Sequence, residues 1–155
     1  MRMHPIARAL AALCLSGGVM VLAAAPVAAT PRSAATPSIR CSSPAPPSWF
    51  YPRLRAAARS DASIPDSWGN SADMARIVCY ESSYRVHASN GDHWGLGQMT
   101  SANIAYYHVS WDNYWNGSST HTIAFYQLLA ALRYCKDRYG SPGAGWQHEI
   151  NYGWW

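Results

Sequence analysis

Apolar side chains recur at helical spacing in the middle of the chain. Met74, Val78 and Glu81 lie at positions i, i+4 and i+7, so they share one face of a helix predicted from residue 70 or 71 to about 83. Two shorter helices are predicted over about residues 52–60 and from residue 100 or 101 to about 107.

The strongest helical signal runs from residue 119 or 120 to 139. Over its middle only Gln127 and Arg133 are strongly polar, and a helix that is apolar on almost every side usually lies at the centre of a domain. Gly140 directly after it and Pro142 two residues later predict a firm stop.

Strand-like alternation is short, with no run longer than about four residues. A small hairpin is expected within residues 85–99, because Asn90-Gly91 is a favoured turn dipeptide. The predicted fold is therefore mainly α, with a buried central helix and a small glycine-rich loop or hairpin region.

Composition supports an ordered domain in the second part of the chain. All eight Trp, ten Tyr and two Phe lie between Trp49 and Trp155, which is too much apolar surface for a disordered polymer. Only 13% of residues are charged and Lys136 is the single lysine, which argues against a nucleic-acid-binding surface.

The beginning of the chain has the pattern of a secretory signal over residues 1–29. Arg2 and Arg8 precede a mostly apolar run, and Val27-Ala28-Ala29 offers a cleavage site. A Pro/Ser-rich linker follows over residues 30–48, and the folded domain is expected over 49–155. We expect a secreted protein, extracellular or associated with the cell wall, without stable membrane insertion after signal cleavage.

Signal cleavage would remove Cys14 and leave three cysteines, of which two are expected to form a disulfide outside the cytoplasm. Three pairings are open. We favour Cys79 with Cys135, because both lie on predicted helices of the same core, whereas Cys41 lies in the linker. A catalytic cysteine is disfavoured, because no partner base is identifiable.

Glu81 is the most conspicuous candidate for chemistry. It ends an apolar helical stripe and has Tyr80 and Tyr84 as near neighbours. Such surroundings disfavour the charged carboxylate and raise its pKa, so that the group can act as a proton donor. The alternative is a helix-terminal glutamate that faces water, as most glutamates do.

A glycine-rich segment follows, Gly91-Asp92-His93-Trp94-Gly95-Leu96-Gly97-Gln98-Met99. Its glycines would let the backbone approach a ligand, and the Gln98 amide suits hydroxyl and amide groups. The spacing matches neither a P-loop nor a dinucleotide-binding motif.

Glu81-Ser82 followed by Gly95-Leu96-Gly97-Gln98-Met99 resembles the soluble lytic transglycosylase (SLT) family of the lysozyme-like superfamily. Residues 131–155 resemble its short secreted and phage-tail members, and the likeness covers about residues 65–155. It implies a lysozyme-like helical domain that cleaves the β-1,4 bond between N-acetylmuramic acid and N-acetylglucosamine in peptidoglycan and leaves 1,6-anhydro ends.

The resemblance implies that Glu81 acts first as general acid and then as general base. Ser82 would orient the Glu81 carboxylate or the substrate, and Gly95 and Gln98 would line the groove. The enzyme would act on glycan strands as a monomer, without a cofactor or metal. The residues expected to bind substrate are Ser82, Tyr84, Trp94, Gly95, Leu96, Gln98 and Met99.

The chain departs from the family in its third motif, where many members carry an Ala-Tyr-Asn-like sequence. Tyr134, Tyr139 and Tyr152 are alternatives for the tyrosine that helps to position the catalytic glutamate. Among the tryptophans, we expect Trp94 at the groove and Trp146 in the core.

Two other interpretations remain open. Asp92, or failing that Asp112, could serve as the second carboxylate of a hydrolytic muramidase, although Asp92 is equally suited to a turn. The domain could also be a module that binds peptidoglycan without cutting it, or a wall protein on a former enzyme scaffold. The histidines lack the spacing of a zinc site.

Overall fold

The computed structural model describes residues 41 and 45–155, which all belong to one compact unit. The predicted signal and most of the predicted linker lie outside the described residues. The elements, in chain order, are α1 (Phe50–Arg59), the 3₁₀ helix η1 (Asp66–Asn70), α2 (Ala72–Ser82), β1 (Ser89–Asn90), β2 (His93–Trp94), β3 (Met99–Thr100), α3 (Ser101–Tyr106), α4 (Trp111–Trp115), α5 (Thr120–Tyr139) and α6 (Pro142–Tyr152).

The prediction of a mainly helical domain is confirmed. The four expected helices correspond to α1, α2, α3 and α5, whereas η1, α4 and α6 were not predicted. The sequence did not predict α6, because Pro142 shortly after Gly140 is also the pattern of a helix stop. Proline is also favoured in the first turn of a helix, and Ser141 caps α6 by accepting a hydrogen bond from Ala144 N at 3.2 Å.

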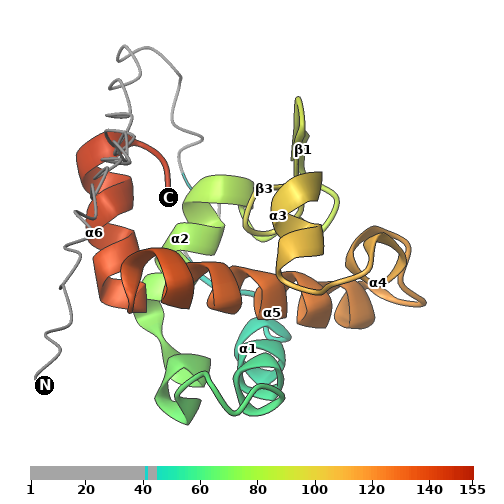
Figure 1. Cartoon of the computed structure of the whole chain (residues 1–155), viewed down its shortest axis with the longest axis horizontal. Coiled ribbons are helices and arrows are strands. Elements are labelled where there is room, and N and C mark those ends of the chain that lie inside the picture. Colours follow the sequence, from blue (N-terminus) through green and yellow to red (C-terminus); the bar gives the residue numbers. More distant parts are fainter. Residues whose placement is uncertain (1–40, 42–44) are drawn as a thin grey trace, which may run out of the picture. The chain divides into compact units, whose positions relative to one another are not determined.

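α5 is the central helix, as its apolar sequence predicts. It packs against α1, α4 and α6, and Figure 1 shows it running across the middle of the domain. Gly140 ends it in a left-handed conformation with φ 75°, which glycine adopts at little cost. The core around α5 is formed by fully buried side chains, among them Phe50, Leu54, Ile77, Leu96, Tyr114, Leu128 and Leu132.

The expected hairpin is present and is part of a small antiparallel sheet in the order β1-β2-β3. Asn90 pairs with His93, so Gly91 and Asp92 form a two-residue loop, and Gly91 has φ 63°. Met99 pairs with Trp94 and adds the third strand, which the short sequence pattern did not predict. The sheet thus joins Met99, the last residue of the glycine-rich segment, to Trp94 within that segment.

Candidate active site

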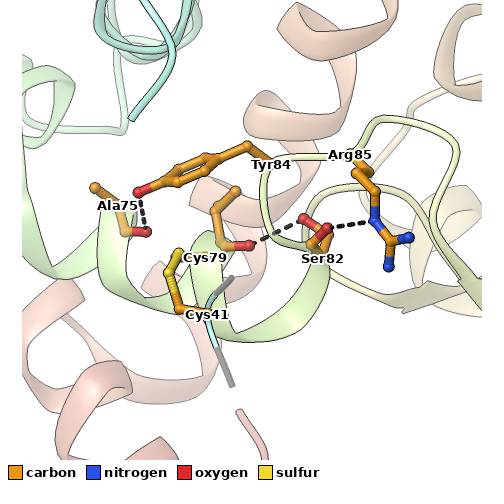
Figure 2. The surroundings of a disulfide bond; sticks show 7 residues. Cys41, Ala75, Cys79, Ser82, Tyr84 and Arg85 are labelled. Atoms are coloured by element: carbon orange, nitrogen blue, oxygen red, sulfur yellow. Dashed lines mark hydrogen bonds between the residues drawn. A yellow bond between two sulfur atoms is a disulfide. The ribbon is translucent and has the colours of Figure 1, made fainter. Parts of the chain in front are cut away.

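The structure corrects the predicted disulfide. Cys79, buried on α2, is bonded to Cys41, with 5.0 Å between their Cα atoms (Figure 2). Cys135, its predicted partner, is a buried free thiol among the described residues and lies against Gly145 of α6. The prediction was wrong because Cys41, which precedes the predicted domain in sequence, lies against α2. The separation of two residues along the chain does not reveal such a contact.

The chain turns sharply directly after Glu81. α2 ends at Ser82, and Ser83 and Tyr84 both have left-handed backbone conformations, with φ of 51° and 60°. Such conformations cost non-glycine residues about 1–3 kcal/mol each, so the surrounding structure must hold them. Tyr84 helps to hold the turn, since its hydroxyl donates to Ala75 O at 3.0 Å (Figure 2).

Ser82, expected to orient Glu81 or the substrate, is fully buried. Its hydroxyl donates to Val78 O at 2.9 Å, one turn back along α2. Its own backbone oxygen accepts from Arg85 Nε at 3.1 Å, as Figure 2 also shows. Ser82 therefore secures the end of α2, and through it the position of Glu81.

Glu81 is partly exposed, and its carboxyl group lies beside that of Glu149 on α6, the only other glutamate of the chain. Glu149 is 6% exposed. Burial, and then the adjacent Glu149 carboxylate, raises the pKa of Glu81 well above its usual range; burial also raises the pKa of Glu149. The pKa of Glu81 is thus raised in the expected direction, and Glu149 is an unpredicted contributor.

The glycine-rich segment is attached to α5 through the buried side chain of Gln127. Gln127 Oε1 accepts from Leu96 N, and its Nε2 donates to Val86 O and Tyr114 O, each at 2.9 Å. Gly95 has φ 75°, and a Cβ there would lie 2.6 Å from Gln127 Cδ. Glycine is therefore needed at position 95, because the Gln127 side chain lies too close to the backbone there for a Cβ atom to fit.

The remaining residues of this segment differ in exposure. Leu96 and Met99 are buried in the core, whereas Trp94 and Gln98 are partly exposed. Gln98 Nε2 donates to Gly95 O at 2.9 Å and to Ala88 O at 3.2 Å, so the amide group braces the loop. Trp94 and Gln98 are thus the members of the predicted binding set in this segment that keep surface for a ligand.

Trp94 belongs to an aromatic cluster with two residues of α4. Its ring lies edge-on to Trp111, 5.3 Å between centroids, and Trp111 stacks on Trp115 at 5.7 Å. Trp111 remains 39% exposed. An exposed aromatic face of this kind suits the apolar face of a sugar ring, although the stacking also stabilises α4.

Asp92 lies at the tip of the hairpin. Its side chain is 78% exposed, and its Oδ1 lies 2.8 Å from His93 Nδ1. The carboxyl group that contacts Glu81 comes instead from Glu149.

The C-terminal residues connect α5, α6 and the glycine-rich segment. Trp155 is buried, its Nε1 donates to Gly97 O at 3.2 Å, and its ring stacks on Tyr139. His148 Nδ1 lies 2.8 Å from Trp154 O. Of the three tyrosines considered for the third motif, Tyr134 and Tyr139 lie against Trp155. Tyr152 lies against His148 and is 60% exposed.

A separate hollow of about 440 Å³ lies beside α3 and α5, and its lining does not include Glu81. Arg133 spans one side of it, with Nε 2.7 Å from Asp61 Oδ2 and Nη1 donating to Tyr107 O at 2.7 Å. Hydrogen bonds from Ser63 and Arg133 lower the pKa of Asp61 to about 2. These contacts connect α5 to the loop after α1, so the Asp61–Arg133 ion pair has a structural role.

Glu149 is the site residue that the sequence analysis missed. Its signal was available, because Ser141-Pro142 is a favoured helix start and Gly153 a favoured helix end, as the structure has them. A helix over 142–152 would have placed the second of only two glutamates on a helix of the same core as Glu81.

In the part of the chain that the structure describes, no group of three or more His, Cys, Asp or Glu side chains could hold a metal ion. No helix among these residues is long and apolar enough to cross a bilayer. Comparison with known protein families, with curated proteins and with solved structures found no match.

Proposed function

We propose that this chain is a secreted, monomeric lytic transglycosylase of peptidoglycan, built on a lysozyme-like helical domain. The observation that carries the proposal is the state of Glu81, a partly exposed carboxyl group whose pKa is raised by burial and by a neighbouring carboxylate. Such a group holds a proton at neutral pH and can deliver it to a leaving-group oxygen.

In the proposed reaction, Glu81 donates its proton to the glycosidic oxygen as the bond from that oxygen to C1 of N-acetylmuramic acid breaks. The Glu81 carboxylate then takes the proton of the muramoyl C6 hydroxyl, whose oxygen bonds to C1. Glu81 ends protonated, the strand is cut, and a 1,6-anhydro ring forms without consumption of water. One acid/base residue is sufficient for both steps.

The predicted binding residues take two roles in this proposal. Trp94 and Gln98, which are partly exposed, would contact the glycan. The buried residues of the set would support the site from the protein interior; these are Ser82, Tyr84, Gly95, Leu96 and Met99.

Mass spectrometry of purified sacculi digested by the protein tests the function and the bond chemistry together. We expect soluble fragments with 1,6-anhydro ends, and Glu81→Gln should reduce their release by about 100-fold or more, since it removes the transferable proton. Asp66→Asn, the same carboxyl-to-amide change on exposed η1, should release fragments like the wild type.

Other results of the same experiment would support the alternative functions. Fragments heavier by one water, with reducing muramic acid ends, would identify a hydrolytic muramidase, in which Asp92→Asn should then also be inactive. Binding to sacculi without released fragments would identify a peptidoglycan-binding module. Substantial lysis by a folded Glu81→Gln variant would remove Glu81 from the proposed role.

A further inference from the structure

The packing of α6 on α2 brings the two glutamates together. A Cβ at Gly145 would lie 3.4 Å from Ile77 Cδ1, so the helices approach closely at this level. One turn further on, at i+4 on both helices, Glu149 meets Glu81. The two helices therefore run in the same direction, as Figure 1 also shows. The lack of a side chain at Gly145 allows their close approach.

The contact between the glutamates requires a proton. Glu149 is 6% exposed, and its buried Oε2 has no N–H or O–H donor among the described residues. Two ionised carboxylates both accept hydrogen bonds and cannot donate one, so the pair is satisfied only if one carboxyl group is protonated. A buried oxygen left without such a proton would be costly.

We infer that Glu149 is a positioning residue for Glu81: the two carboxyl groups share one proton, and the negative charge of the pair keeps that proton available on Glu81. This inference rests on the proposed function for its catalytic meaning. The carboxyl pair itself can be tested without any activity.

The closeness of the pair separates Glu149 from a second catalytic carboxylate. In glycosidases that use two carboxyl groups, these lie about 5–9.5 Å apart with the scissile bond between them. Two adjacent carboxyl groups leave no such space, so Glu149 acts through Glu81. When Glu81 gives its proton to the glycosidic oxygen, two negative charges face each other, and Glu81 becomes a stronger base toward the C6 hydroxyl.

The other titratable groups of the two helices are engaged elsewhere. On α2, Arg76 pairs with Asp73 at 2.7 Å, and the Tyr80 ring lies edge-on to Trp146. On α6, His148 contacts Trp154 O, and Tyr152 lies against His148. From α5, Tyr139 and Cys135 lie against Gly145 of α6.

Carbon-13 NMR of the whole protein, labelled in the glutamate side-chain carboxyl carbons, tests the inference directly, because the chain has two glutamates. In the wild type we expect two coupled titration steps, one of them above neutral pH. In Glu149→Gln, which keeps the shape and removes the charge, the single remaining signal should titrate lower by about one pH unit or more. Asp66→Asn should leave both steps unchanged.

The alkaline limb of the lysis profile should move to lower pH by the same amount in Glu149→Gln, a change that a purely structural role would not produce. Independent titration of both wild-type signals near their ordinary values would overturn the inference, even if the variant failed to fold. An unshifted Glu81 signal in a folded variant would do the same.

The two proposals can fail separately. Coupled titration without lysis would refute the proposed transglycosylase activity and support the carboxyl pair. Lysis with independent titration would support the activity and refute the carboxyl pair.

Discussion

Replacing Gln127 by leucine should detach the glycine-rich segment from the central helix. The Gln127 amide is the buried link between α5 and three backbone groups, Leu96 N–H, Val86 C=O and Tyr114 C=O, each at 2.9 Å. Leucine has a similar size and no polar atoms, so the substitution removes these bonds while opening little space.

The expected cost follows from the groups left behind. Gln127, Leu96 and Tyr114 are fully buried and Val86 is 7% exposed, so water cannot readily replace the lost partners. Each unsatisfied buried group costs about 1–3 kcal/mol, and the apolar leucine recovers about 1–2 kcal/mol. With each of the three groups at the middle of that range, about 6 kcal/mol in all, the net loss is about 4–5 kcal/mol. This is a large part of the 5–15 kcal/mol that is typical of a domain.

Urea unfolding followed by tryptophan fluorescence and circular dichroism measures this loss, and Tm should fall by roughly 12 °C or more. Gln147→Leu is the matched control, because Gln147 is exposed on α6 and the change should cost little. If the free energy of unfolding of Gln127→Leu lies within about 1 kcal/mol of the wild type, the argument from unsatisfied backbone groups is refuted.

The Cys41–Cys79 disulfide spans 38 residues, so Cys41→Ser should lower the free energy of unfolding by about 4 kcal/mol. Non-reducing peptide mapping should link these two cysteines, and a Cys79–Cys135 peptide would contradict the structure. Burial raises the pKa of Cys135 to about 12, so alkylation of its thiol should require unfolding, and rapid reaction in the native state would show it to be accessible. The pKa of Asp61 falls from 3.8 to about 2 on folding, so its contribution to stability is present above pH 3.8 and is lost as the pH falls towards 2. Asp61→Asn should flatten the acid limb of the stability curve, and an unchanged slope would exclude the Asp61–Arg133 pair as its source.

Local signals predicted the parts of the fold that depend on neighbours in sequence. Ser71, Thr100 and Ser119 cap helices, and each is one of the two start residues predicted for its helix. A cap needs only a side-chain oxygen within reach of a backbone N–H three residues on. Gly140 ends α5 for a similarly local reason. The short helices η1 and α4 carry too few turns for a periodic pattern, and packing rather than pattern stabilises them.

The candidate site, like the fold, was predicted from the sequence only in part. The stripe of Met74, Val78 and Glu81 indicated a carboxyl group at the edge of the core, since helical periodicity fixes which side chains share a face. The glycine at 95 was interpreted as room for a ligand, whereas the structure fills that room with Gln127. Periodicity reports that a position is crowded or buried, but not which side chain lies opposite.

The sequence by itself determined a mainly helical domain around residues 120–139 and singled out Glu81, because caps, stops and helical faces act over a few residues. Only the tertiary structure decided that Glu149 meets Glu81 and that Cys41, not Cys135, is bonded to Cys79. Both contacts join segments far apart in the chain, and such pairings depend on how whole helices pack, which no local pattern encodes.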